Sequence, residues 1–254
     1  MGQTIACANQ KGGVGKTTTV VNLATSLALS GQRTLVLDLD PQGNATSGFG
    51  VDRASLSGTM YDVLLGDAPL ESIVVDTASG CRLAPASVAV AGAEVELASA
   101  EQRERRLSSS LRSARDDYDY ILIDCPPSLG LLTVNALTAA QSVLIPTQCE
   151  YYALEGLSQL IATLNLVRDN LNPTLAIKGV VLTMFDARTN LSADVAAEVR
   201  RHFGPAVFDT VISRNVRLSE APSFGLPIAL YRPDSRGAQA YAELAAELLR
   251  RDGR

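Results

Sequence analysis

A glycine-rich segment near the start of the chain, Gln10–Thr18, constrains the fold more than any other feature of the sequence. It reads Gln-Lys-Gly-Gly-Val-Gly-Lys-Thr-Thr, with the short apolar run Thr4–Ala8 before it and a helical pattern over Thr17–Ser30 after it. Glycines let several backbone N–H groups converge on one anion, and a helix N-terminus adds partial positive charge at the same point. A strand, a glycine loop and a helix in this order predict a phosphate-binding loop.

The residues of this loop have distinct expected roles. Lys16 is expected to reach the β- and γ-phosphates of a nucleoside triphosphate, and the Thr17 hydroxyl is expected to bind Mg²⁺. The common pattern G-x-x-x-x-G-K-[ST] is not fully met, because Gln10 stands at its first glycine and an additional lysine, Lys11, precedes the glycines. The nucleotide-binding residues expected from the loop are Lys11, Gly12, Gly13, Val14, Gly15, Lys16, Thr17 and Thr18.

Acidic residues follow two other apolar runs. Asp38 and Asp40 come after Leu35–Leu37, and Asp124 comes after Tyr120–Ile123. Ligands of open α/β sheets bind beyond the carboxyl ends of the strands, so these carboxylates are expected beside the phosphate loop. An apolar strand that ends in Asp is the Walker B arrangement, which holds Mg²⁺ directly or through water.

The rest of the chain alternates short apolar runs with segments of helical period. Strands are expected at Thr4–Ala8, Thr34–Asp38, Cys81–Pro85, Tyr120–Asp124, Ser142–Pro146, Lys178–Met184 and Val207–Ile212. Helices are expected at Thr17–Ser30, Ala91–Arg115, Leu154–Asn170, Ser192–Phe203 and Gly237–Arg250. This alternation predicts an α/β fold, a single-domain P-loop NTPase over residues 1–254 with a mostly parallel twisted sheet and helices on both faces.

Composition excludes several other classes of protein. The chain has 46% hydrophobic residues and a net charge of -5, which fits a globular protein and argues against wholesale coating of nucleic acid. Its four cysteines are widely spaced, which excludes a zinc ribbon and a thioredoxin-like site and favours buried reduced thiols. No run approaches the roughly 20 apolar residues of a membrane span. A cytoplasmic protein is therefore expected, without stable membrane association.

With Lys11 beside Lys16, the loop resembles the deviant Walker A signature of the ParA/MinD family of ATPases. The resemblance extends over nearly the whole chain, through the stretches 40–48, 124–130, 148–156 and 214–222. The loop lies close to the N-terminus with no helix-turn-helix segment before it. In this respect the chain is most similar to the small chromosomal ParA (Soj) class.

The resemblance implies an ATP-driven switch for chromosome or plasmid partitioning. ATP and Mg²⁺ would hold a sandwich homodimer, in which Lys11 of each copy reaches the other copy's nucleotide. The dimer would bind double-stranded DNA non-specifically and associate with the nucleoid. A ParB-type centromere-binding protein would stimulate a weak ATPase, and hydrolysis would release the DNA. The catalytic residues implied are Lys11, Lys16 and Asp40, with Asp40 positioning the attacking water; the metal-site residues are Thr17, Asp38 and Asp124.

The C-terminal third offers candidates for the DNA and adenine contacts. Residues 186–254 hold ten arginines and nine carboxylates, whereas residues 1–185 hold twelve basic and eighteen acidic residues. Arg188, Arg214 and Arg217 are the expected DNA-binding residues, with Arg200, Arg201, Arg250 and Arg251 as further phosphate contacts. By resemblance, Met184 and Pro233 are expected at the adenine pocket.

Other members of the family leave alternatives open. A MinD-like regulator of division would share the phosphate-site residues and bind a membrane through its last helix. That helix places Tyr241, Leu244, Ala245, Leu248 and Leu249 on one stripe, which is expected to pack against the core. A nitrogenase-iron-protein-like redox ATPase would need cluster-bridging cysteines. A scaffold with negligible turnover is the remaining alternative.

Overall fold

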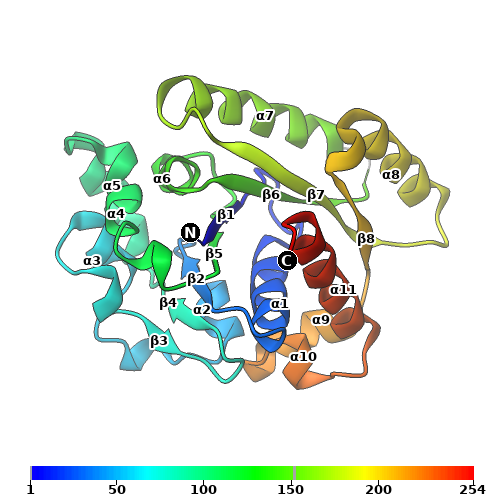
Figure 1. The fold of residues 1–254 in the computed structure, drawn as a ribbon, viewed down its shortest axis with the longest axis horizontal. Coiled ribbons are helices and arrows are strands. Elements are labelled where there is room, and N and C mark those ends of the chain that lie inside the picture. Colours follow the sequence, from blue (N-terminus) through cyan, green and yellow to red (C-terminus); the bar gives the residue numbers. More distant parts are fainter. Residues whose placement is uncertain (1, 151–152) are drawn as a thin grey trace.

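The computed structural model of the chain describes residues 2–150 and 153–254, so Tyr151 and Tyr152 of the stretch 148–156 lie outside the described residues. One sheet runs through the fold in the strand order β3-β4-β2-β5-β1-β6-β7-β8 (Figure 1). The strands are β1 Gln3–Cys7, β2 Thr34–Asp38, β3 Val75–Asp76, β4 Arg82–Ala84, β5 Tyr120–Asp124, β6 Ser142–Gln148, β7 Ala176–Phe185 and β8 Val207–Ser213. Neighbouring strands are parallel except β3 and β4. The expected α/β class with a mostly parallel sheet is confirmed.

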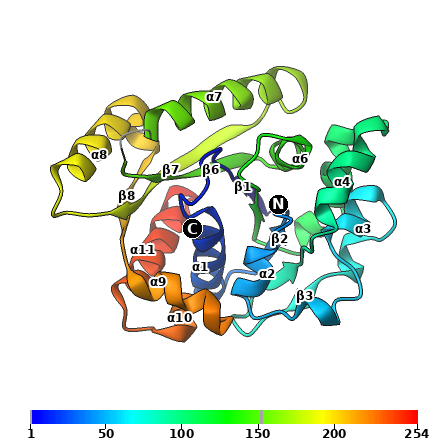
Figure 2. The ribbon, with the colours of Figure 1, turned by 180° about the vertical axis from the view of Figure 1, so that it is seen from behind.

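Helices cover both faces of the sheet. They are α1 Lys16–Leu29, α2 Asn44–Gly48, α3 Met60–Leu65, α4 Val90–Glu96, α5 Arg106–Ser110, α6 Leu131–Ala139, α7 Ala153–Asn170, α8 Asn190–Phe203, α9 Val216–Glu220, α10 Ile228–Tyr231 and α11 Arg236–Arg251. Figures 1 and 2 show α7 and α8 along one side of β6, β7 and β8, and α1 with α11 along the other side. Because both faces are covered, the middle residues of the central strands are mostly apolar, as in other parallel sheets.

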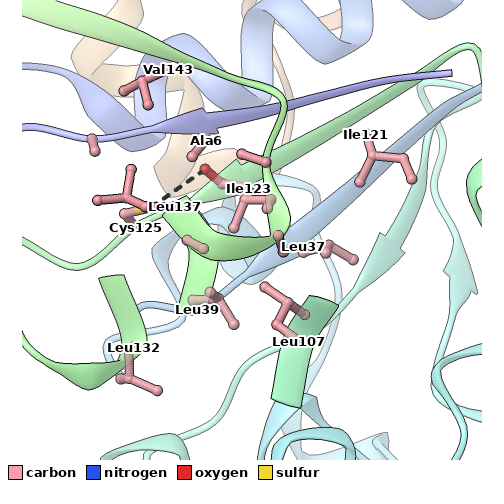
Figure 3. Packing of buried hydrophobic residues seen from close by; sticks show 14 of the residues in the cluster. Ala6, Leu37, Leu39, Leu107, Ile121, Ile123, Cys125, Leu132, Leu137 and Val143 are labelled. Atoms are coloured by element: carbon pink, nitrogen blue, oxygen red, sulfur yellow. Dashed lines mark hydrogen bonds between the residues drawn. The ribbon is translucent and has the colours of Figure 1, made fainter. Parts of the chain in front are cut away.

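Two clusters of buried side chains fill the space between the sheet and these helices. The larger cluster joins strand residues such as Leu37, Ile121 and Ile123 to Leu132 of α6 and Leu107 of α5 (Figure 3). The second cluster packs the opposite face of the sheet against α1 and α11. All four cysteines are buried and free, as their spacing predicted.

The position of β1 at the centre of the sheet decides where the site lies. β1 pairs with β5 on one side and with β6 on the other, and β5 pairs with β2. Asp124 is the register partner of Cys7 in β1 and of Asp38 in β2. The carboxyl ends of these strands therefore meet at one edge, where ligands of such sheets bind.

The prediction of a single helix over Ala91–Arg115 is wrong. The structure has α4, a 3-10 turn at Leu97–Ser99, another at Arg103–Arg105, then α5 and a further turn at Ala114–Asp116. The chain is extended at Ala100, and Gln102 has a left-handed φ of 52°, which no helix continues through. Helical period persists on both sides of the break, so periodicity alone predicts one helix. The two-residue edge strand β3 was also missed.

The C-terminal helix α11 packs on the core, as its apolar stripe predicted. Tyr241, Leu244 and Leu248 are buried, and the Tyr241 hydroxyl lies 3.3 Å from the Thr19 hydroxyl of α1. On the same helix Glu247 accepts hydrogen bonds from the backbone of Asp209 and Thr210 in β8. Among the residues that the structure describes, no helix combines the length and the apolar character needed to cross a bilayer.

Candidate nucleotide-binding site

The helix α1 begins directly after the glycine loop with its N-terminus free. Gly13 and Gly15 have φ values of 74° and 89°, which glycine adopts at low cost. Gly15 is the N-cap, so no side chain caps the helix, and the first turn contains no acidic residue. The N–H groups of that first turn have no partner within the helix, and they point where an anion would bind.

The loop is open on one side and anchored on the other. A Cβ added at Gly12 or Gly13 would meet no atom within 4 Å, so the hollow is open to a ligand. Asn9 accepts a hydrogen bond from the Lys11 backbone and donates one to the Pro146 carbonyl of β6. The Thr183 hydroxyl of β7 donates to the Val14 carbonyl at 2.8 Å. Sequence reasoning missed Asn9 and Thr183, because only the pairing of distant strands brings them to the loop.

The two lysines of the loop lie in different environments. Lys16 is buried, and its Nζ donates to the carbonyl oxygen of Lys11 at 3.2 Å. Lys11 forms an ion pair with Glu150, just after β6, at an Nζ–Oε2 distance of 3.1 Å. The Lys11 side chain is 34% exposed, so a second molecule can contact it.

Asp124, at the end of β5, is a buried carboxylate close to the loop. It is fully buried, and neither of its oxygens has a hydrogen-bond partner of ordinary length among the described residues. Burial raises the pKa of Asp124 well above its usual value, and the charge of Asp38 adds to the rise. The Thr17 hydroxyl and the Lys16 charge oppose that rise, which places both groups near the carboxylate. An unpaired buried charge is costly unless a ligand compensates it.

Asp38 has a different set of contacts, although it is equally buried. Its Oδ1 accepts from the backbone N–H of Asp40 at 3.2 Å, and its Oδ2 accepts from the backbone N–H of Thr46 at 2.8 Å and the Thr46 hydroxyl at 2.7 Å. Burial raises the pKa of Asp38 to about 6, against these hydrogen bonds. The Asp38 carboxylate thus binds the segment that follows it, which carries the nearly buried Asp40.

A cavity of about 520 Å³ opens beside the loop, between the ends of β7 and β8. Gly15 and Thr18 line it on one side, and Met184, Arg214 and Val216 line it on the other. Met184, expected at the adenine pocket, lines this cavity together with the loop residue Gly15, and its contact with adenine stays a prediction. Pro233 is exposed in the turn before α11 and is not among the residues that line the cavity.

The expected DNA-binding arginines follow β7 and β8, after the carboxyl ends of these strands. Arg188 follows β7 and its side chain is 86% exposed, with both ends of the guanidinium on Asp186. Arg214 follows β8, and its backbone N–H donates to the Phe185 carbonyl of β7. Arg217 in α9 is exposed and pairs with Glu220 at 2.7 Å.

The other arginines considered for phosphate contacts lie elsewhere. Arg200 and Arg201 of α8 pair with Asp209 and Glu198. Arg251 is held within the fold by Glu247 and by the carbonyls of Pro205 and Val207. Arg251 is therefore not free to contact DNA without breaking these bonds.

The residues present suit a nucleoside triphosphate with Mg²⁺. Mg²⁺ prefers oxygen ligands and binds through one or two carboxylates together with substrate phosphates. The described residues contain no cluster of three His, Cys, Asp or Glu side chains able to hold a metal alone. Asp124 and the Thr17 hydroxyl supply part of such a set, and the phosphates above the glycine loop would complete it.

Comparisons with known proteins agree with this geometry. A family described as an AAA domain matches residues 2–177. The chain is 57% identical to the sporulation initiation inhibitor protein Soj of Bacillus subtilis, over 98% of each chain. It is 54% identical to the chromosome partitioning protein ParA of Myxococcus xanthus, over 99% of this chain and 89% of the relative. A solved structure of cobyrinic acid a,c-diamide synthase from Mycobacterium smegmatis, with bound ATP analog and magnesium, superposes with a TM-score of 0.88 at 39% identity, covering 100% of this chain and 98% of that one.

Proposed function

Since this chain belongs to the ParA/MinD-type family of P-loop ATPases, we propose that it is an ATP-driven switch for chromosome or plasmid partitioning. In this proposal the chain binds DNA while ATP is bound and releases DNA after hydrolysis. The observation that carries the proposal is the arrangement around α1. An uncapped helix N-terminus and an open glycine loop offer a place for phosphates, and the buried carboxylate of Asp124 lies near Lys16 and Thr17 of that helix.

The chain's own residues then have these tasks with ATP. The loop N–H groups and Lys16 bind the β- and γ-phosphates, for which Lys16 exchanges its bond to the Lys11 carbonyl. Thr17 and Asp124 would hold Mg²⁺, with Asp38 supporting that site from the neighbouring strand. When bound, Mg²⁺ would supply neutralisation of charge on the phosphates. Asp40 orients the water that attacks the γ-phosphorus, and the products are ADP and phosphate.

Lys11 links hydrolysis to the pairing of two copies. It is held by Glu150 rather than by its own loop, and it is partly exposed at the edge where the nucleotide binds. In the proposed sandwich homodimer, Lys11 of each copy leaves Glu150 for the phosphates of the other copy's ATP. The nucleotide is then buried between two molecules, which makes dimerisation depend on ATP.

DNA binding is assigned to Arg188, Arg214 and Arg217. Arg188 follows β7, and Arg214 and Arg217 follow β8, so all three come after strands whose carboxyl ends lie at the nucleotide edge of the sheet, and Arg214 lines the cavity. The proposal is that ATP-driven pairing brings the arginines of both copies to one face. Arginine contacts to phosphates are electrostatic and carry no base readout. A ParB-type protein is the proposed stimulating partner, and the ATP-bound form is proposed to associate with the nucleoid in the cytoplasm.

The test is binding to random-sequence duplex DNA with ATP and with ADP. An Asp40→Ala variant slows turnover so that the ATP state persists, and a salt series measures the electrostatic part. We expect ATP-dependent binding that weakens steeply as salt rises. Equal, negligible binding with both nucleotides, in a variant shown to dimerise on ATP, would refute the partitioning role. Anionic vesicles, run in parallel, test the MinD-like alternative directly.

A further inference from the structure

The buried Thr46 side chain of α2 joins the end of β2 to the segment that follows β4. Its hydroxyl donates to Asp38 Oδ2 at 2.7 Å and accepts from the backbone N–H of Ala86 at 2.9 Å. A hydroxyl has one proton and two lone pairs. Because the Ala86 N–H occupies a lone pair, the proton of Thr46 is directed to the carboxylate.

Asp38 connects Thr46 to the backbone of Asp40. The carboxylate receives Thr46 on Oδ2 and the Asp40 N–H on Oδ1. Asp40 Oδ1 in turn accepts the N–H of Gln42 at 2.9 Å. The Asp40 backbone is thus tied to the Asp38 carboxylate, and that carboxylate is tied in turn to Thr46.

The helix that carries Thr46 cannot hold this position alone. α2 has five residues and begins after Gly43, without a side-chain cap. So short a helix is unstable in isolation and depends on tertiary contacts. The Ala86 N–H, which follows β4, supplies a fixed point outside the helix.

We infer that Thr46 is a positioning residue for ATP hydrolysis, which acts through Asp38 to fix the backbone of Asp40. The inference rests on the proposed function, in which Asp40 orients the attacking water. Thr46 itself touches neither water nor phosphate in this assignment. Its removal should therefore lower kcat and leave nucleotide affinity nearly unchanged.

The experiment compares Thr46→Val, Thr46→Ala and Thr46→Ser with the wild type. The valine variant keeps the shape and loses the hydroxyl, the alanine variant leaves room for a water molecule, and the serine variant keeps the hydroxyl. Thr25→Val is the matched control, because Thr25 is equally buried but its hydroxyl donates to the Val21 carbonyl within α1. Each protein is assayed for kcat with MgATP, for the dissociation constant of a fluorescent ATP analogue, and for backbone amide exchange over residues 38–48.

We expect Thr46→Val to lower kcat by about 10- to 100-fold, the scale of a misplaced reacting group. Serine should restore kcat nearly to the wild-type value, and alanine should fall between serine and valine. Amide exchange over residues 38–48 should rise in the valine variant without nucleotide, and the Thr25 control should change neither quantity.

Two results overturn the inference: a valine variant with wild-type kcat, or a serine variant as impaired as valine. If the valine variant does not fold, the alanine variant decides in its place, and a wild-type kcat there overturns the inference. A wild-type protein without ATPase activity defeats the proposed function instead. Amide exchange still tests the Thr46 anchor in that case, and unchanged exchange would refute the anchor itself.

Discussion

Asp38 and Asp124 are register partners at the ends of β2 and β5, and their carboxylates differ in the hydrogen bonds that they accept. Asp38 accepts three hydrogen bonds from Asp40 and Thr46. In the part of the chain that the structure describes, neither oxygen of Asp124 has a hydrogen-bond partner at an ordinary distance. Both groups are completely buried. The fold thus contains one organised carboxylate and, beside it, one that a bound cation would compensate.

Asp124→Asn should stabilise the nucleotide-free protein. The raised pKa means that the folded state binds more protons than the unfolded state, whose Asp pKa is about 3.9. Stability therefore falls as pH rises from there towards the folded pKa, and the amide avoids this loss. We expect a gain of about 1–3 kcal/mol at pH 8 that shrinks towards pH 4. Urea denaturation without metal measures it.

Asp38→Asn is the control for that substitution and should gain less stability. Burial raises the pKa of Asp38 too, to about 6, so the amide removes the same kind of cost, but it also replaces an oxygen that accepts hydrogen bonds from Asp40 or Thr46 with an NH₂ group. Added MgATP should raise the melting temperature of the wild type but not of Asp124→Asn. If Asp124→Asn gains no more stability than Asp38→Asn, the Asp124 carboxylate is already paired in solution.

Glu247 should give the protein acid sensitivity. Burial alone would raise the pKa of Glu247, but hydrogen bonds from Thr210 and Asp209 and the charge of Arg251 outweigh burial and lower it. Its contribution is therefore present above the unfolded pKa of about 4.3 and is lost as pH falls through the folded value. Glu247→Gln should cost about 1–3 kcal/mol at pH 7 and flatten the acid side of the stability curve. Glu243→Gln, exposed on the same helix, should do neither.

Lys16→Ala and Lys11→Ala should separate nucleotide binding from dimerisation. Lys16 is buried at the loop, so its loss should weaken ATP binding by at least about tenfold, as for a charge-assisted contact. Lys11 pairs with Glu150, so Lys11→Ala should leave ATP binding to the monomer intact and prevent the ATP-dependent dimer. Nucleotide titration and light scattering measure the two effects. A dimer that persists in Lys11→Ala would contradict the assigned role.

Arg188→Ala and Arg217→Ala should each weaken DNA binding equally on all sequences. Loss of one phosphate contact lowers the slope of log affinity against log salt by about one. Arg82→Ala is the control, because Arg82 is also exposed and ion-paired, with Asp76, but lies at the start of β4, at the opposite edge of the sheet from the nucleotide. An unchanged salt slope in both test variants would move the DNA contact to another surface.

Local patterns predicted the parts of the molecule that depend on local sequence. Each of three features depends on one short segment: the glycine loop, Asp124 at the end of β5, and the apolar stripe of α11. The structure has all three at the expected positions. The break at Gln102 was not predictable from helical period, because one backbone angle interrupts a pattern that continues on both sides.

The contacts between distant segments could not be predicted. Two such contacts are the hydrogen bond from Thr183 to Val14 and the ion pair between Glu150 and Lys11. They form only when β6 and β7 pair beside β1. Thr46 carries no signal of its own, because threonine is a common residue and its role comes from Ala86, forty residues later. The residues expected to carry out the chemistry were predictable from their types, whereas the contacts that position those residues could be found only in the tertiary structure.

The chain has only three lysines, and their burial has a practical consequence. Lys16 is buried in the loop, and the Lys178 side chain is 12% exposed and paired with Asp252. Lys11 is the one ε-amino group of the three with substantial access to solvent. A mild acylating reagent should therefore modify the side chain of Lys11 first. The rate of that reaction would then report how much of the nucleotide site is occupied, in protein that carries neither a label nor a mutation.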